Sequence, residues 1–361
     1  MRPFATLSRL AVCVAVYHFV SCHVCASEGA TEEDFTPHLK TGISLSPIVG
    51  YEPTYGTIIG GAYFQENLDP RKEKWYVVGA GTFQKKFGIE AGYKLWTSNH
   101  WIYDLEFDGN TFYDAYFGEG NRGRKEDRVG LQNLRLNLYP TVWYRLTHDW
   151  SVGALSEIRY RDDWGTDNNS GEHFLPSEVT AVMGLAVEND TRDNVAFPKH
   201  GSYHLLIVDA GPPFMSNRSE GSLFGRIRQE NRFFWNPVDP LVLALQVALG
   251  TSVGEPGYQF RFRLGGNKRL RGFEPNRFRG DHYYMIQPEA RLQIQSWLGL
   301  VWFAGIGDAA GSRLSEFQTP QFTGGMGLRV GLPPDYVARA RIDVGVSREN
   351  TAVYLNFQEA F

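Results

Sequence analysis

Polar and apolar side chains alternate along most of this chain, the pattern of β-strands that have one wet face and one apolar face. Between residues 283 and 295 the odd positions include Gln287, Glu289 and Arg291, whereas most even positions are apolar. The same period of two recurs in residues 336–346. A transmembrane β-barrel has this pattern because its apolar face meets lipid and its polar face lines the lumen. A soluble sandwich is the alternative, but the charged faces are long and recur on nearly every predicted strand.

The alternating segments predict a single all-β domain over residues 45–361, a sixteen-stranded antiparallel transmembrane β-barrel. The candidate strands lie near residues 45–51, 55–66, 74–83, 86–97, 100–110, 129–147, 150–162, 176–189, 200–210, 221–233, 239–252, 281–296, 298–308, 322–331, 336–347 and 351–361. An even number of strands places both ends of the barrel in the periplasm, where the turns are short. The longer connections would then be extracellular, and they lie near residues 111–128, 163–175, 253–280 and 309–321.

The first 26 residues have the features of an export signal. Arg2 and Arg9 supply positive charge, an apolar run follows, and small residues precede a cleavage site after residue 26. All three cysteines lie in this segment, so the mature chain would have no disulfide or thiol chemistry. Residues 27–44 then form a short periplasmic segment before the barrel. A lipoprotein acylated at Cys22 is the alternative interpretation.

A long connection between two predicted strands, residues 253–280, carries the most distinctive sequence of the chain. It contains a pair of glycines and then Arg271, Gly272 and Phe273. Loops of this length inside a compact β protein are usually functional or disordered, and glycines permit sharp turns and close backbone approach. We expect this sixth extracellular loop to fold back into the barrel lumen.

The arginine of this loop is expected to be held by a carboxylate. A guanidinium pairs well with a carboxylate through two parallel hydrogen bonds. Glu289 lies on the polar face of the next strand and is the first candidate partner of Arg271. Asp308 is the second candidate, although its parity places it with the lipid-facing residues of its strand.

Four segments in order resemble motifs of the BamA/TamA family of outer-membrane proteins, also called the bacterial surface antigen family. They are the barrel entry at residues 47–56, the motif Tyr116-Phe117-Gly118-Glu119-Gly120-Asn121, the turn from Asp190 to Gly201, and Leu270-Arg271-Gly272-Phe273, with Glu359-Ala360-Phe361 at the end. The last of the four resembles the family's (V/I)RG(F/Y) motif, with leucine in place of the usual valine. The resemblance covers the barrel.

The resemblance implies an outer-membrane barrel with an inward-folded loop locked by Arg271, and a role in inserting or translocating other polypeptides. Typical family members carry POTRA domains before the barrel, and this chain has no room for one, so it looks like a short form. The family's usual partner of the loop arginine is an aspartate, at a position where this chain has Gly305. The final Phe361 resembles the signal by which such barrels are recognised for insertion.

The turn motif comprises Asp190, Arg192, Asp193, Pro198 and Gly201. Aspartate side chains stabilise turns through hydrogen bonds to nearby backbone groups, and Pro198 with Gly201 favours a chain reversal. We therefore predict a structural role in a periplasmic turn for these residues.

These observations predict a bacterial outer-membrane protein that assembles or translocates polypeptides, in contact with lipid and lipopolysaccharide. Client outer-membrane or secreted polypeptides and a separate periplasmic protein are the expected partners. The net charge of −4 gives no indication of nucleic-acid binding. A passive or plugged channel and a structural surface antigen are the alternatives.

No enzyme, metal site or cofactor is expected from the sequence. His200 and His204 are four residues apart, but on a strand this is not the helical spacing of a metal pair. Ser202 and His204 are the one close candidate for a nucleophile and its base, and no flanking motif supports them.

Overall fold

The computed structural model describes residues 11–14, 42–52, 56–67, 72–97, 100–111, 114–121, 123–166, 177–195, 197–217, 223–331, 339–357 and 359–361. Sixteen long strands account for most of these residues. In chain order they are β2 (Gly42–Glu52), β3 (Gly56–Asn67), β4 (Lys72–Thr82), β5 (Phe87–Trp96), β6 (Trp101–Asn110), β8 (Val129–Arg145), β9 (Trp150–Thr166), β10 (Glu178–Asp190), β11 (Gly201–Gly211), β12 (Phe224–Val238), β13 (Leu241–Gly254), β16 (His282–Gln295), β17 (Leu298–Ala310), β18 (Gln321–Gly331), β19 (Arg339–Ser347) and β20 (Thr351–Phe357). The short elements are β1 (Ala11–Val14), β7 (Asp114–Tyr116), β14 (Phe262–Leu264), β15 (Phe278–Gly280) and the 3₁₀ helices Lys125–Asp127, Pro213–Met215, Tyr258–Phe260 and Leu314–Glu316.

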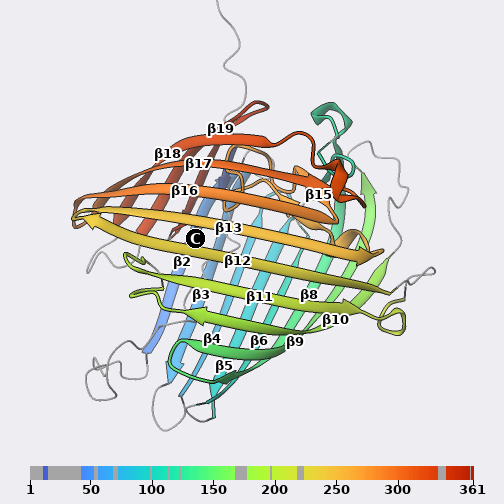
Figure 1. Ribbon diagram of the computed structural model, residues 1–361, viewed down its shortest axis with the longest axis horizontal. Coiled ribbons are helices and arrows are strands. Elements are labelled where there is room, and N and C mark those ends of the chain that lie inside the picture. The colour runs from blue at the N-terminus through green and yellow to red at the C-terminus, as the bar shows by residue number, and fades with distance from the viewer. Residues whose placement is uncertain are drawn as a thin grey trace, which may run out of the picture.

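Consecutive long strands pair antiparallel, and the sheet curls into a barrel (Figure 1). The predicted all-β, sixteen-stranded antiparallel barrel is confirmed, and every predicted strand overlaps an observed one. At the seam between the first and last long strands, β1 pairs parallel with β20 and also contacts β2. In the described part of the chain, no backbone ladder joins β20 directly to β2. Residues 11–14 belong to the segment predicted as an export signal, and its removal stays a prediction.

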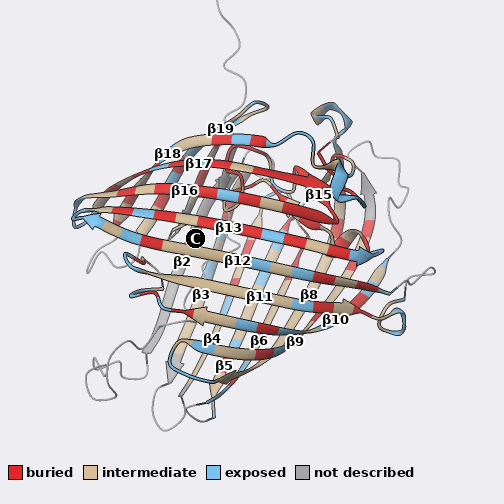
Figure 2. Ribbon diagram, viewed as in Figure 1, coloured by how far each residue is buried: buried red, intermediate tan, exposed pale blue. Residues whose placement is uncertain are grey.

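The burial of side chains follows the period of two seen in the sequence (Figure 2). On β16, Met285 and Gln287 are 0% exposed, whereas Ile286 between them is 40% exposed. Odd positions of this strand therefore face the lumen, and even positions face outward, where apolar side chains meet lipid. The described residues contain no helix that is long and apolar enough to cross a membrane.

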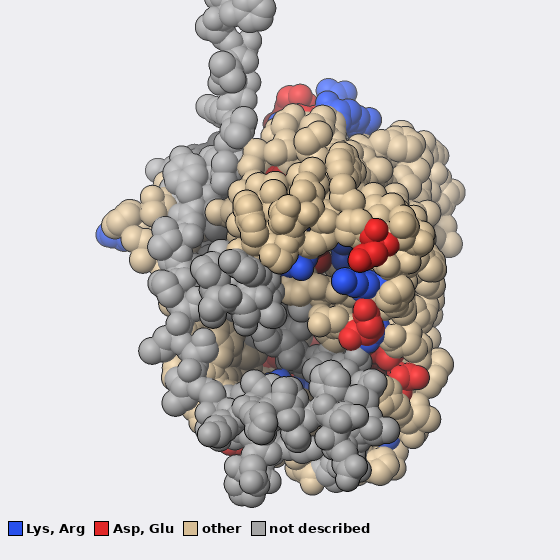
Figure 3. All heavy atoms as spheres, turned by 90° about the vertical axis from the view of Figure 1, so that its left-hand side faces the viewer, with Lys and Arg blue, Asp and Glu red and all other residues tan. Residues whose placement is uncertain are grey.

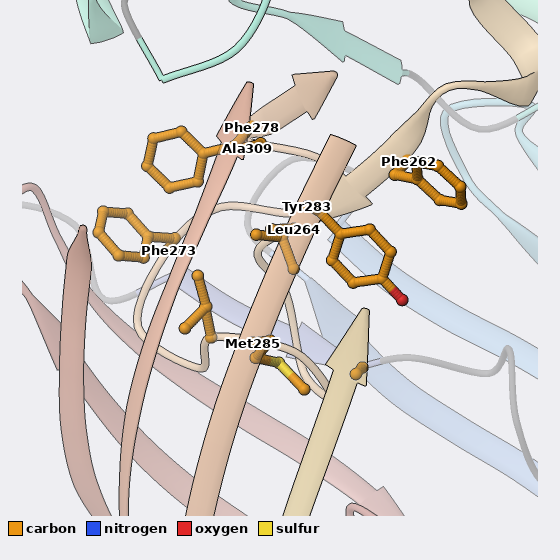
Figure 4. Close-up of a cluster of buried hydrophobic side chains, with 9 residues drawn as sticks. Phe262, Leu264, Phe273, Phe278, Tyr283, Met285 and Ala309 are labelled. Atoms are coloured by element: carbon orange, nitrogen blue, oxygen red, sulfur yellow. The ribbon is translucent and has the colours of Figure 1, made fainter. Parts of the chain in front are cut away.

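Loop 6, which we define as residues 255–281, folds inward as predicted. Its strands β14 and β15 form a hairpin that contacts the barrel strands β16 and β17. Apolar side chains of the loop pack with those of the wall in one buried cluster (Figure 4), formed by Ala248, Phe262, Leu264, Leu270, Phe273, Phe278, Tyr283, Met285 and Ala309. This cluster gives loop 6 an apolar anchor within the barrel.

Candidate functional site

Arg271 lies at the tip of loop 6 and is completely buried in the lumen. Its guanidinium pairs with Glu289 of β16 and also with Asp343 of β19, to which Nη1 donates a hydrogen bond of 2.7 Å. The same group lies over the ring of Phe303 on β17, 3.6 Å from the ring centroid, where a cation is attracted to the π face. One side chain therefore holds loop 6 against three strands of the wall.

The backbone at the tip of loop 6 approaches β19 closely. Gly272 has a φ of +123°, and a Cβ at this position would lie 2.8 Å from the carbonyl carbon of Val346. The Gly272 amide donates to the hydroxyl of Tyr354 at 2.8 Å, and that hydroxyl donates to the carbonyl of Phe273 at 3.0 Å. Ser347 Oγ donates to the Gly272 carbonyl at 2.9 Å. Only glycine fits at residue 272, which gives the Arg-Gly-Phe sequence a physical reason.

The two acids that hold Arg271 also hold other arginines, and the contacts close into a ring. In order around it, the members are Arg271, Glu289, Arg291, Glu359, Arg329 and Asp343. We call this set the ion ring. Each of its side chains is at most 9% exposed, and positive and negative members alternate. A buried charge that loses its partner is strongly destabilising, so each member of the ion ring depends on its neighbours.

The ion ring joins loop 6 to the end of the chain. β20 ends at Phe357, whereas the last strand was predicted to reach residue 361. Glu359 lies off the strand, and its carboxylate is 2.7 Å from Nε of Arg329 and 3.9 Å from Nε of Arg291. Glu359 therefore lies among lumen arginines and not on the lipid face of the barrel. A carboxylate is unfavourable beside lipid, and the two buried lumen arginines stabilise it instead.

Phe361, the predicted insertion signal, is buried inside the barrel. Its ring packs against Phe234 and Ala244, and its carbonyl accepts a hydrogen bond of 2.9 Å from Arg291. Figure 1 places the C-terminus within the outline of the barrel. Figure 3 looks onto the end with the short turns, where acidic and basic side chains gather around a hollow. A role of Phe361 in insertion stays a prediction, and would precede the docking seen here.

We expect Glu359→Gln to loosen both the end of the chain and loop 6. The change leaves Arg291 and Arg329 short of one negative charge in a buried setting, which destabilises the barrel by about 3 kcal/mol. Urea unfolding in detergent micelles measures the loss, and trypsin cleavage within loop 6 measures the release of the loop. Glu126→Gln, at an exposed acid of another loop, is the matched control. Unchanged cleavage of loop 6 in Glu359→Gln would show that the tail and the loop are independent.

Asp308, the second candidate partner of Arg271, lies elsewhere. It is completely buried and accepts hydrogen bonds from the Asn121 side chain and from the amides of Ala309 and Thr319, at 2.8 and 3.3 Å for the two amides. The candidate pairing of Asp308 with Arg271 is therefore wrong. The parity of Asp308 correctly placed it on the outward side of β17, and neighbouring loops, which supply Asn121 and Thr319, bury it there.

Loop 3, residues 111–128, closes over loop 6. The amide of Gly120 donates to the carbonyl of Arg279 at 2.6 Å. The Arg279 guanidinium pairs with Asp114 at 3.2 Å, and the Asn276 side chain donates to the same carboxylate at 3.0 Å. The aromatic and glycine-rich motif that ends at Asn121 thus helps to position loop 6, a role that its sequence did not reveal.

The turn from residue 190 to residue 201 is held by its own side chains. Arg192 donates from Nε and Nη2 to the two carboxylate oxygens of Asp190, at 2.8 and 2.7 Å. Asp193 accepts hydrogen bonds from the amides of Lys199 and His200, at 2.9 and 3.1 Å. Because these partners all lie within the turn, the contacts support the predicted structural role.

We expect Gly201→Ala to destabilise this turn. Gly201 follows the buried Pro198 and has a φ of +92°, and a Cβ there would lie only 2.1 Å from the carbonyl oxygen of Thr191. Strain of this kind costs about 1–3 kcal/mol, measurable as a lower urea midpoint. Gly225→Ala on β12 is the control, since the nearest atom to its added Cβ would be 3.6 Å away. An equal effect of both substitutions would contradict the argument.

A cavity of about 330 Å³ remains in the lumen between loop 6 and the wall. Arginines dominate its lining, namely Arg159, Arg226, Arg228, Arg261, Arg263 and Arg269. Several of them share carboxylates, as Arg226 does with Glu157 and Asp209, both at 2.7 Å. Loop 6 therefore occupies the lumen without filling it, and a space lined by charged side chains is left.

Comparison with known proteins places this barrel in a family. Residues 96–358 match the Omp85 superfamily domain. The chain belongs to the Omp85 superfamily. The family resemblance predicted from the sequence motifs is thus confirmed, and this Omp85 protein is an outer-membrane β-barrel of bacteria. Among curated proteins, none matches the sequence.

Three solved structures share the Omp85 barrel fold with this chain. The crystal structure of BamA from Haemophilus ducreyi lacking POTRA domains 1–3 gives a TM-score of 0.59 at 12% identity, covering 88% of this chain and 69% of that one. CdiB from Escherichia coli gives 0.60 at 14% identity, covering 88% and 61%. CdiB from Acinetobacter baumannii gives 0.55 at 9% identity, covering 85% and 62%. This chain spans less than two thirds of either CdiB structure, and at these identities the similarity establishes the fold.

Proposed function

We propose that this Omp85 barrel assembles or translocates other polypeptides at the outer membrane, through the seam between β20 and β2. The observation that carries the proposal is how the end of the chain is held. Glu359 and Phe361 are fixed in the lumen by side chains, whereas among the described residues the two seam strands meet through the short strand β1 and not through a ladder of their own. Amides and carbonyls at such an edge can bind an extended segment.

The edge of β20 already accepts an extended segment of this chain. Residues 11–14 pair in parallel with residues 352–355 along it. A client strand would use the same backbone donors and acceptors, and binding through the backbone depends little on the client's side chains. This independence suits a protein that handles outer-membrane or secreted polypeptides of varied sequence, delivered by a separate periplasmic partner.

The ion ring gives the seam a means of control. Glu359 follows β20, so displacing that strand would pull its carboxylate from Arg291 and Arg329. Arg291 also pairs with Glu289, a partner of Arg271, so the disturbance would reach loop 6 within two contacts. We propose that loop 6, locked by Arg271, Gly272, Phe273 and Glu289, keeps the lumen closed at rest and is released when a client strand enters the seam.

Quantitative proteomics of the outer membrane tests the proposed function. We expect depletion of this protein to cause a selective fall in other barrels or in secreted proteins, and the proteins that fall would be its clients. Re-expression of the wild-type gene in the depleted strain is the control for indirect effects. An unchanged profile would remove the assembly role.

Cross-linking the seam tests the mechanism. Cysteines replacing Leu45 on β2 and Phe357 on β20 would be joined by reagents of about 5 and 10 Å, one and two spacings of neighbouring strands. Both lengths are needed because β1, which contacts both strands, belongs to the segment predicted to be removed. The native cysteines are replaced by alanine in this background. We expect cross-linking to abolish activity, whereas the same reagents across the paired residues Leu185 and Val208 should leave it intact. Full activity of the cross-linked seam would contradict the mechanism.

A plugged channel is the second candidate function, and the arginine-lined cavity favours it. An anion-selective conductance in planar bilayers, increasing when Arg271→Ala loosens loop 6, together with an unchanged outer-membrane proteome, would support a channel. A protein with neither property would be a structural surface protein.

A further inference from the structure

A serine, a histidine and an asparagine on the outer face of the barrel are aligned as in a hydrolytic triad. Ser202 Oγ lies 3.0 Å from Nε2 of His204, and Nδ1 of the same ring lies 2.9 Å from Oδ1 of Asn231. An amide oxygen only accepts hydrogen bonds, so Nδ1 carries the ring hydrogen. Nε2 is then the basic nitrogen and faces the serine hydroxyl, which is the tautomer that a general base requires.

The sheet register builds this arrangement. Ser202 and His204 are two residues apart on β11 and so share a face, and His204 lies directly opposite Asn231 of β12. Phe233 packs edge-on against the imidazole, with ring centroids 5.2 Å apart. Gln229 also donates a hydrogen bond of 3.4 Å to Oδ1 of Asn231, the same oxygen that faces Nδ1 of His204. The three groups are thus held by two strands of a rigid wall.

The triad lies on the face that meets lipid. Leu206, Val208 and Trp235, on the same face of the same two strands, are 41%, 49% and 50% exposed. Polar side chains on such a face are unfavourable in hydrocarbon, so a cluster of them indicates a function. Ser202 is the second residue of β11, which places it near the end of the wall.

We propose that Ser202, His204 and Asn231 hydrolyse an acyl ester of a membrane lipid. Ser202 Oγ attacks the ester carbonyl carbon while its proton passes to Nε2 of His204. The bond to the lipid alcohol then breaks, and His204 returns the proton to the leaving oxygen. Water attacks the acyl-serine with His204 as base, which releases a carboxylic acid and restores Ser202. Asn231 acts as a positioning residue for the imidazole.

Thr191 helps to position the serine. Its hydroxyl lies 3.2 Å from Ser202 Oγ, donates to the Ser202 carbonyl oxygen at 3.2 Å and accepts from the Ser202 amide at 2.9 Å. These contacts fix the start of the strand that carries the nucleophile. The sequence argued against catalysis because no flanking motif supports Ser202 and His204, and the third member, Asn231, is contributed by the next strand.

The test uses the full chain, purified in detergent and mixed with micelles of dioleoyl phosphatidylethanolamine. We expect release of oleic acid, detected by mass spectrometry, and a covalent adduct on Ser202 after treatment with a fluorophosphonate probe. Ser202→Ala should lower the release by roughly 10³-fold. Asn231→Leu should lower kcat with little change in KM, and Asn231→Asp should restore activity, which a purely structural role would not produce.

Thr251→Val is the matched control, because Thr251 and His282 form another hydroxyl–imidazole pair, 2.8 Å apart, outside the proposed site. It should retain full release of oleic acid. Retained shift of gel mobility on heating verifies that each variant is folded. Equal release by wild type and Ser202→Ala, or no release together with no adduct on Ser202, would overturn the proposal. Neither outcome tests the proposed function at the seam, because the triad lies on β11 and β12 and the seam lies between β20 and β2.

Discussion

Replacing Arg271 with alanine is expected to release loop 6 from the lumen. The substitution leaves Glu289 and Asp343 as buried carboxylates that have each lost a cation, and it removes the contact with the Phe303 ring. Breaking a buried pair by deleting one partner costs about 3–5 kcal/mol, and here two pairs are broken. Trypsin should then cut the folded variant at Lys268 or Arg269, within the freed loop.

Cleavage is measured on the folded protein in detergent, with the fragments identified by mass spectrometry and stability followed by urea unfolding. Arg313→Ala is the control, because Arg313 is exposed in another loop and its loss should change stability by less than about 0.5 kcal/mol. A variant of Arg271 that resists trypsin as well as wild type does would show that the apolar cluster alone holds loop 6.

Asp343→Asn is expected to be at least as damaging as Arg271→Ala. The substitution keeps the shape of the side chain and removes its negative charge. In the wild type, the Asp343 carboxylate lies 2.7 Å from Nη1 of Arg271, 2.6 Å from Nη1 of Arg329 and 3.6 Å from Nε of Arg341. Three guanidinium groups would then share less negative charge in a space closed to solvent. We expect a loss of stability of about 3–5 kcal/mol.

A double-mutant cycle separates this effect from general damage to the barrel. If Arg271 and Asp343 act through each other, the loss of stability in the double variant should fall short of the sum of the single losses by about 1–3 kcal/mol. Asp149→Asn, at an acid whose side chain is 44% exposed, provides the baseline. Strict additivity of the two single substitutions would mean that the pair makes no specific contribution.

Much of the fold could be predicted because a barrel wall has a simple local rule. Period two determines which side chains face lipid and which face the lumen, so the strands and the polar faces could be located from the residues alone. The pairing of Arg271 with Glu289 followed from the same rule, since Glu289 lies on the lumen face of the strand after loop 6. The inward fold of loop 6 rested on its length and glycines.

Contacts between distant strands could not be predicted, because period two gives the face of a residue but not its height in the barrel. Asp343 was not among the candidate partners of Arg271, and the structure brings it beside Arg271 and leaves it 0% exposed. Asn231 meets His204 only through the register of two strands. The inward turn of Glu359 depends on Arg291 of β16 and Arg329 of β18 lying together in the lumen. Residues so far apart in the chain cannot be matched from local sequence.

The order in which the chain is synthesised determines when the ion ring can form. Glu359 follows β20, the last strand of the wall, so the ion ring cannot close until that strand has been synthesised and exported. A product that stops before Glu359 can still form its earlier hairpins, but we expect its loop 6 to stay unlocked and open to proteases. Closure of the ion ring would therefore report that the last strand is in place.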